Sequence, residues 1–149
     1  MKTLIQRVKS ANVVVGGKKI GEIGNGLLVL LGITNSDKES DVDFFVDKIV
    51  NLRIFEDETQ KMNLSLLETK GEVLVISQFT LYADCKGQRR PSFINAAGRD
   101  FALELYKKLV HKFKELGIKT AEGEFGAMMD VTLVNSGPVT IMLDSEELR

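Results

Sequence analysis

The chain of 149 residues has very few of the side chains that enzymes most often use for metal and acid–base chemistry. It contains one cysteine, Cys85, one histidine, His111, and no tryptophan. A disulfide framework needs paired cysteines, and zinc sites are built from clustered Cys and His ligands. The composition therefore excludes a disulfide-stabilised fold and argues against a zinc finger, a di-histidine zinc site and a Cys–His protease. We expect neither a metal nor a cofactor.

Long hydrophobic runs are also absent. The longest apolar run, residues 27–33, contains a glycine and is far shorter than the roughly 20 residues that cross a bilayer. The first ten residues, MKTLIQRVKS, lack the apolar core of a secretory signal. A single cysteine fits a reducing compartment. We therefore expect a cytoplasmic protein with no membrane association, and the length predicts one domain spanning residues 1–149.

The charge is balanced overall but distributed unevenly. The formal net charge is −1, yet basic residues outnumber acidic ones by nine to three in residues 86–119. A basic block in a neutral chain is typical of a surface that faces phosphates. A solvated helix face would produce the same pattern. Charge alone leaves both interpretations open.

The first 34 residues predict β structure. Short β-rich runs occupy residues 3–8 and 12–15, and Gly16-Gly17 has the form of a hairpin turn. Residues 27–31 are apolar throughout, which is typical of a strand that is covered on both faces. Further strands are expected at 73–81, 118–122, 129–135 and 139–143.

Two segments have the apolar spacing of helices. Ser36 and Glu39 match the Ser-x-x-Glu capping box, and the helical pattern then continues to about Leu52. The second helix is expected from Arg99 to a C-cap at Gly117. Residues 56–72 between them are polar and predict an irregular loop. The order of elements predicts an α+β fold with a mostly antiparallel sheet and two main helices.

Two short segments conflict with their surroundings. Ser77-Gln78-Phe79-Thr80 follows an apolar run, where a buried Gln needs hydrogen-bond partners. Gly137-Pro138 lies between two apolar strands, although proline cannot donate to a sheet ladder, and it is the most favourable place in the chain for a cis peptide bond. Taken singly, strand alternation explains the first segment and a hairpin turn explains the second.

Taken together, Ser-Gln-Phe-Thr and Asn-x-Gly-Pro-x-Thr, about sixty residues apart, resemble the paired motifs of the D-aminoacyl-tRNA deacylase family. One departure is Ser136, where the family more often has an acidic residue. The matching stretches run along the whole chain: residues 1–8, which include Arg7, and residues 77–81, 86–93, 125–129 and 137–140.

The resemblance implies an esterase that acts on tRNA. Members of this family hydrolyse the ester between a D-amino acid, or in many members glycine, and the terminal adenosine of tRNA. Their fold is a compact, β-barrel-like α+β domain. They are homodimers with two active sites at the interface, and each site receives the Gly-Pro motif of the other subunit.

The resemblance also implies roles for particular residues. One wall of the pocket would consist of Ser77, Gln78, Phe79 and Thr80. Gly137 and Pro138 of the other subunit would form the opposite wall and select the D-amino acid by backbone contacts. Arg7 would brace the Gly-Pro loop, with Thr140 also at the substrate. Phe125 and Met129 would lie near the terminal adenine. The tRNA backbone would contact basic residues of the block described above: Lys86, Arg89, Arg90, Lys107 and Lys108.

Ester hydrolysis needs a water molecule, a proton acceptor and stabilisation of an oxyanion. Backbone N–H groups of Phe79 and Thr80 could form the oxyanion hole. The sequence offers no placed His, Asp or Glu as a proton acceptor, so either Thr80 Oγ is the nucleophile or the ribose 2′-OH of the substrate assists water. We favour the second, because an alcohol without an adjacent base is a poor nucleophile. The alternatives to this function are a non-catalytic nucleic-acid binding protein of the same fold and an esterase or amidase for free D-amino acid derivatives.

Overall fold

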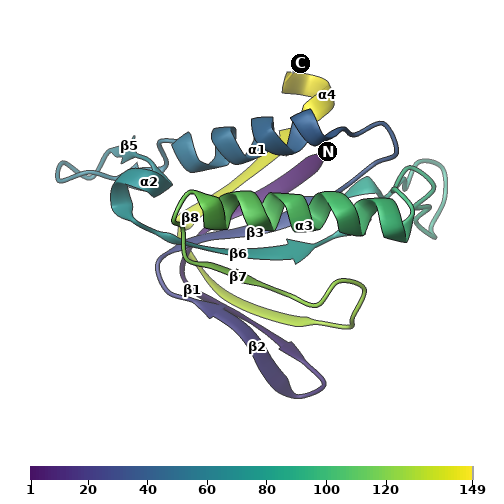
Figure 1. The fold of residues 1–149 in the computed structure, drawn as a ribbon, viewed down its shortest axis with the longest axis horizontal. Helices are drawn as coiled ribbons and strands as arrows, with labels where there is room; N and C mark the ends of the chain where they lie inside the picture. Colours follow the sequence, from purple (N-terminus) through teal and green to yellow (C-terminus); the bar gives the residue numbers. More distant parts are fainter. Residues whose placement is uncertain (149) are drawn as a thin grey trace.

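In the computed structural model, which describes residues 1–148, one curved six-stranded sheet carries two long helices on one face (Figure 1). A small hairpin of two further strands lies beside it. The elements in chain order are β1 (Lys2–Val15), β2 (Lys18–Ile23), β3 (Gly26–Gly32), α1 (Glu39–Asn51), β4 (Phe55–Glu56), β5 (Met62–Leu64), α2 (Leu66–Thr69), β6 (Glu72–Ser77), the 3₁₀ turn η1 (Phe79–Tyr82), α3 (Arg99–Glu115), β7 (Thr120–Glu122), β8 (Asp130–Asp144) and α4 (Ser145–Leu148).

The sheet is mixed, so the prediction of mostly antiparallel pairing was wrong. Strand β1 is antiparallel to β2, β3 and β8, whereas β3 pairs with β6 in parallel and β6 with β7 in parallel. The two predicted main helices explain why some strand pairs are parallel. The chain passes through α1 between β3 and β6 and through α3 between β6 and β7, and parallel neighbours require such crossover connections.

The sheet curls until it is almost a barrel. Its path runs β2-β1-β3-β6-β7, yet the two outer strands of this path approach each other closely. A Cβ atom built on Gly21 of β2 would lie 2.9 Å from the carbonyl oxygen of Glu122 in β7. The absence of a side chain at Gly21 therefore permits this approach.

The curled sheet has an apolar core on each face. Leu27, Val29 and Leu31 of β3 pack with residues of α1 and α3, including Phe45 and Phe113. The alternate β3 residue Leu28 packs into the interior of the curled sheet with Leu74, Ile76, Val8 and Val13. Both faces of β3 are thus covered, as the continuous apolar run at 27–31 predicted.

Helix α1 begins two residues later than the sequence pattern predicted. The backbone N–H of Lys38 donates to Asp41 Oδ2 at 2.7 Å, so Asp41, and not Glu39, closes the first turn. The reason lies in Asp37, which is buried. Its carboxylate accepts hydrogen bonds from the N–H of Thr34 and from the N-terminal ammonium group of Met1, and these contacts hold the preceding residues in a turn.

The predicted irregular loop at 56–72 contains regular structure. It includes most of the β4–β5 hairpin and the single helical turn α2. In α2, Ser65 Oγ accepts from the Glu68 N–H at 3.3 Å and Glu68 Oε2 accepts from the Ser65 N–H at 2.7 Å. This is a capping box, and its Ser-x-x-Glu pattern was present in the sequence.

No helix within residues 1–148 is long and apolar enough to span a membrane.

The predicted pairs of short strands at each end of the chain are continuous strands in the structure. Residues 3–8 and 12–15 belong to β1, and the segments on either side of Gly137-Pro138 belong to β8. The hairpin turn that would explain this Gly-Pro taken singly is therefore not formed. Gln6 pairs with Thr140 and Val8 pairs with Asn135, so residues 136–139 bulge out of the ladder opposite Arg7.

The approach of β3 to β6 predicts different effects for two glycines of the same turn. A Cβ atom on Gly26 would overlap the backbone of Glu72, whereas a Cβ on Gly24 would meet no atom within 4 Å. We expect Gly26→Ala to lower the free energy of unfolding by about 3 kcal/mol, because backbone cannot move aside as a flexible side chain can. Gly24→Ala is the matched control and should change it by less than about 0.5 kcal/mol. Urea denaturation of both variants measures the difference, and equal midpoints would contradict this packing.

Candidate active site

The Ser-Gln-Phe-Thr segment leaves the sheet at its second residue. Strand β6 ends at Ser77, and the Gln78 N–H donates to the carbonyl oxygen of Leu31 at 2.7 Å. The chain then forms the 3₁₀ turn η1, so the predicted strand to residue 81 and its simple alternation of side chains were wrong. The turn fits because Gly32 of β3 has no side chain, and a Cβ there would lie 3.1 Å from Leu81 Cβ.

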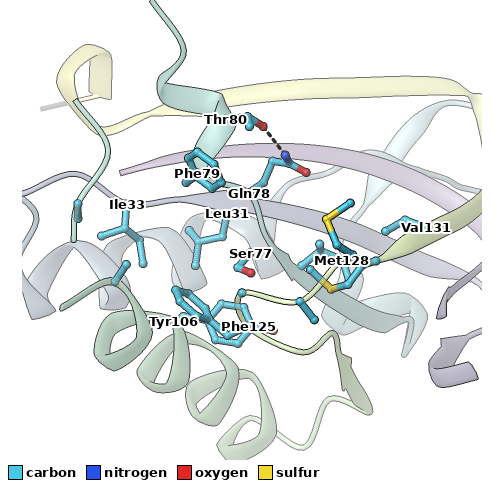
Figure 2. Close-up of a pocket in the computed structure, with 16 residues that line it drawn as sticks. Leu31, Ile33, Ser77, Gln78, Phe79, Thr80, Tyr106, Phe125, Met128 and Val131 are labelled. Carbon is cyan, nitrogen blue, oxygen red and sulfur yellow. Dashed lines mark hydrogen bonds between the residues drawn. The ribbon is translucent and has the colours of Figure 1, made fainter. Parts of the chain in front are cut away.

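This turn presents polar groups at its start. Gln78 Nε2 donates a hydrogen bond to Thr80 Oγ1, and the Thr80 side chain is exposed (Figure 2). Within residues 1–148, the backbone N–H groups of Phe79 and Thr80 donate to no acceptor. Two unbonded donors thus lie side by side in the chain at the first turn of a 3₁₀ helix.

A cavity of about 480 Å³ opens beside this segment. Ser77, Gln78, Phe79 and Thr80 form one side of it, and α3 and the loop between β7 and β8 form the other (Figure 2). Most of the lining is apolar. The lining residues other than those four are Leu31, Ile33, Ile76, Ala97, Ala102, Tyr106, Phe125, Gly126, Ala127, Met128, Met129 and Val131.

Tyr106 of α3 supports the deep part of this cavity. Its hydroxyl donates to the Val75 carbonyl oxygen at 3.0 Å, and its ring packs against Phe125 with centroids 5.6 Å apart. Burial raises the pKa of Tyr106 well above its usual value, and the nearby carboxylate of Glu122 raises it further. Tyr106 is therefore neutral near pH 7, and its hydroxyl is engaged with the backbone.

Exposed apolar side chains surround the mouth of the cavity. Phe79 is 57% exposed and Met128 is 92% exposed, although both line the cavity. The ring of Phe93 meets Phe79 edge to face, with centroids 5.1 Å apart. A largely apolar cavity with a few polar groups on one wall is typical of a site for a small molecule or for the end of a larger ligand.

Arg99 lies next to two residues that line this cavity, Phe125 and Gly126, although the sequence did not identify it as a site residue. Its Cζ atom is 5.9 Å from the centroid of the Phe125 ring. Gly126 has a φ of +80°, and a Cβ there would lie 2.5 Å from Arg99 Nη1. Only the folded chain brings these positions together, because 26 residues or more separate them in sequence.

The bulge that holds Gly137 and Pro138 is firmly braced from behind. Arg7 is only 6% exposed, and it donates from Nε to the Ser136 carbonyl oxygen at 3.1 Å and from Nη1 to the Ile54 carbonyl oxygen at 2.7 Å. Its Nη2 also lies 3.7 Å from Glu56 Oε1. Arg7 therefore contacts the loop that the resemblance assigned to it.

Asn135 closes the bulge from inside β8. Its Oδ1 accepts from the Val139 N–H at 3.0 Å, and its Nδ2 donates to Thr140 Oγ1 at 2.9 Å. Thr140 therefore contributes its hydroxyl to the bulge, and it does not line the cavity. Asn135 belongs to the sequence motif, but its role is visible only in the structure. Its side chain links the two ends of the bulge by hydrogen bonds.

The bulge and the cavity do not meet within one chain. The Gly137-Pro138 peptide bond is cis, both residues are exposed, and neither lines the cavity beside Ser77 and Thr80. The structure thus brings Phe125 and Met129 together with the Ser77–Thr80 wall. It leaves Arg7, Gly137, Pro138 and Thr140 at a separate place on the same molecule.

The candidate tRNA-binding cations fall into two groups. Lys108 is bound to Glu104 and Glu39 at 2.9 and 3.0 Å, and these hydrogen bonds raise its pKa. Two further lysines of α3 pair with Asp43 and Glu122. Within residues 1–148, the remaining candidates have no ion pair or hydrogen bond from their side chains: Lys86, Arg89, Arg90 and Lys107.

Among residues 1–148, no group of three or more His, Cys, Asp or Glu side chains is arranged to hold a metal ion.

Comparison with known proteins finds close similarity along the whole chain. A family model described as D-Tyr-tRNA(Tyr) deacylase matches residues 4–144. A protein named D-aminoacyl-tRNA deacylase from Clostridioides difficile (strain 630) is 56% identical over 147 residues, which is 99% of each chain. A protein of the same name from Thermosipho africanus (strain TCF52B) is 53% identical over 148 residues, again 99% of each chain.

Two solved structures also resemble the chain. A structure named c-Myc DNA Unwinding Element Binding Protein is 40% identical, has a TM-score of 0.91, and the match covers 97% of this chain and 99% of that one. A structure described as a probable eukaryotic D-amino acid tRNA deacylase is 17% identical with a TM-score of 0.82, over 95% of this chain and 97% of that one. At that identity, the second likeness shows the fold alone.

Proposed function

Because this chain belongs to the D-Tyr-tRNA(Tyr) deacylase family, we propose that it hydrolyses the ester bond of D-aminoacyl-tRNA and releases the D-amino acid and the tRNA. One observation carries the proposal from family to site. The Ser77–Thr80 segment and the loop at 125–129 are separate parts of the resemblance, and they enclose a single cavity.

The cavity suits the terminal adenosine with its aminoacyl ester. Its volume of about 480 Å³ is in the usual range for small-ligand sites. Phe125 and Met129 offer an aromatic ring and a polarizable thioether to the adenine, and bases commonly stack on such groups in single-stranded RNA recognition. With the adenine there, the ester would extend toward Phe79 and Thr80 on the opposite wall.

Two backbone donors are available for the oxyanion of this ester. The N–H groups of Phe79 and Thr80 have no acceptor in the described chain, so an oxyanion would meet donors already in place. Such donors lower the barrier most when they need no rearrangement, and η1 holds these two in one turn.

The proton acceptor comes from the substrate in our proposal. The cavity-lining residues, all of which lie within residues 1–148, include no His, Asp or Glu. Thr80 Oγ1 already accepts a hydrogen bond from Gln78, and no base is next to it. An alcohol in that state is a poor nucleophile. The ribose 2′-OH next to the ester therefore assists the attacking water, and Thr80 supports the wall.

A second subunit completes the site. The Gly137-Pro138 bulge is exposed and rigidly held by Arg7 and Asn135, yet it lies away from the cavity of its own chain. The cavity in turn has an open mouth with exposed Phe79 and Met128. We propose a homodimer in which the bulge of each subunit covers the cavity of its partner.

In this dimer the bulge selects the chirality of the amino acid. Backbone atoms at Gly137 and Pro138 would face the α-carbon, where an L-amino acid places its side chain and a D-amino acid places hydrogen. A steric barrier there rejects L-amino acids of every type, without a separate pocket for each side chain. Glycine has only hydrogen at that position, so glycyl-tRNA would also be accepted.

Contacts to the tRNA backbone are expected from basic residues that have no other partner. Lys86, Arg89 and Arg90 lie in the loop that follows η1, and the ring contact of Phe93 with Phe79 holds this loop at the cavity mouth. Together with Lys107 they can bind phosphates without reading sequence. Lys108 is already neutralised by two carboxylates, so the proposal rests on the other four. We further propose that residues 1–149 fold as one domain and that the homodimer acts in the cytoplasm.

The alternative function is nucleic-acid binding without catalysis. It is favoured by the 40% identical protein that is named for binding a DNA unwinding element. The deacylase proposal predicts loss of the ester on incubation with D-tyrosyl-tRNA, at a rate at least about a hundredfold above that for L-tyrosyl-tRNA. Release of labelled tyrosine, with enzyme-free samples as the control, measures both rates. Binding of the tRNA with no ester loss would establish the alternative.

The proposed proton path predicts opposite effects for two hydroxyl groups. Thr80→Val keeps the shape of the side chain and should retain activity within about tenfold of wild type. A D-tyrosyl-tRNA that ends in 2′-deoxyadenosine should react at least about a hundredfold more slowly, because it has lost the assisting group. Single-turnover deacylation separates these steps from binding. An inactive valine variant together with normal turnover of the deoxy substrate would identify Thr80 as the nucleophile.

The shared site predicts that two impaired variants restore each other. Gln78→Ala removes a side chain that lines the cavity, and Gly137→Ala places a Cβ 2.7 Å from Arg7 Nη2 at a φ of +120°. Each should lose more than about tenfold in activity. In a 1:1 mixture after subunit exchange, half of the dimers are mixed and each has one native site, so about a quarter of the wild-type activity should return.

The control for this experiment is the Gln78→Ala, Gly137→Ala double variant mixed with Gln78→Ala. Every site in that mixture lacks the Gln78 side chain, so no activity should return. Recovery in the control, or an active species that sediments as a monomer, would contradict the shared site.

A further inference from the structure

Arg99 has the surroundings of a residue that binds an anion at the cavity mouth. It is the first residue of α3, and its guanidinium group lies close to the Phe125 ring and to Gly126, both of which line the cavity. The ring centroid is 5.9 Å from Cζ, and the space that a Cβ on Gly126 would occupy is 2.5 Å from Nη1. The Arg99 side chain therefore packs against the loop that carries these two residues.

The positive charge of Arg99 has no acidic partner within the described chain. In residues 1–148 its guanidinium forms no ion pair and donates no hydrogen bond, and it is exposed. Arg7 and Arg53 differ in this respect, because each donates to oxygen atoms of its own chain. An arginine that is placed by an aromatic ring but keeps its N–H donors free is suited to a phosphate, which two parallel donors can bind at once.

The proposed substrate carries one suitable anion close to the adenosine. The carboxyl group of the amino acid is esterified and the adenosine itself is uncharged, so the nearest negative charge is the phosphate on its 5′ side. We propose that Arg99 binds this phosphate and so holds the terminal adenosine against Phe125. This inference rests on the proposed function, because it takes the occupant of the cavity from there.

The proposed contact between Arg99 and the phosphate is distant from the ester, and this distance determines how the contact affects the kinetics. A phosphate bound equally in the ground state and in the transition state lowers KM and leaves kcat unchanged. The Arg99 interaction should therefore appear in KM, or in Ki for a competitor, and should depend on whether the phosphate is present. A merely structural role for Arg99 would not depend on the phosphate.

The test compares 3′-O-D-tyrosyladenosine with its 5′-monophosphate, as substrates and as competitors of D-tyrosyl-tRNA deacylation. For the wild-type protein, the phosphate should lower KM or Ki by about tenfold, as a charge-assisted hydrogen bond does. For Arg99→Ala, the two compounds should have equal values. Arg99→Lys keeps the charge without the planar fork and should retain only part of the preference.

Lys61→Ala is the charge-matched control. Lys61 is exposed in the β4–β5 hairpin, which lies at the opposite end of the molecule from the start of α3 (Figure 1). The Lys61→Ala variant should keep the full tenfold preference for the compound with the 5′ phosphate. A loss of the preference in this variant would indicate a general effect of net charge.

Two results would overturn the assignment of Arg99. One is a full phosphate preference in Arg99→Ala, and the other is no preference in the wild-type protein. Failure of the proposed function would look different, because the wild-type protein would then not deacylate D-tyrosyl-tRNA at all.

Discussion

The parallel pairing of β3, β6 and β7 is the constraint on which the candidate site depends. Parallel strands place their carboxyl ends at the same edge of a sheet, and ligand sites of such sheets commonly form there. Here the end of β3 supplies Leu31, β6 continues into Gln78 and η1, and β7 continues into the loop with Phe125. Because α3 connects β6 to β7, its first turns also reach this edge. Segments about fifty residues apart thus enclose one cavity.

A second constraint separates the cavity from the Gly-Pro bulge. The antiparallel ladder of β1 and β8 continues on both sides of the bulge, so residues 136–139 must project from it. Arg7 fills the space behind them, and its two bonds to carbonyl oxygens fix the bulge to the segment at Ile54. Burying a guanidinium group is unfavourable unless its donors are bonded, and these carbonyls provide the partners. The result is a braced backbone surface that does not line the cavity of its own chain, as the proposed shared site requires.

The electrostatic pattern follows from the same folding. Within α3, the lysines that face α1 and β7 are neutralised by Glu39, Asp43 and Glu122. Among the basic residues at 86–119, all of which the structure describes, those without a carboxylate partner lie in the loop before α3, at Lys107 and at Arg99. The basic block seen in the sequence is therefore partly a solvated, paired helix face and partly an unpaired surface next to the cavity. The paired part matches the interpretation of a solvated helix face, whereas the phosphate-facing interpretation of the unpaired part stays a prediction.

Local sequence determined much of this protein. The two helices and the fully covered strand β3 follow from apolar spacing and turn residues within short segments, whereas the motifs at 77–80 and 135–140 were identified by their resemblance to a family. Tertiary structure alone decided the rest. Parallel pairing, the 3₁₀ turn after Ser77 and the bulge opposite Arg7 depend on contacts between residues far apart in the chain, such as Gly32 with Leu81 and Arg7 with Ser136. Such contacts leave no periodic trace in the sequence, because each is a single steric or hydrogen-bond fit that exists only after the elements have packed.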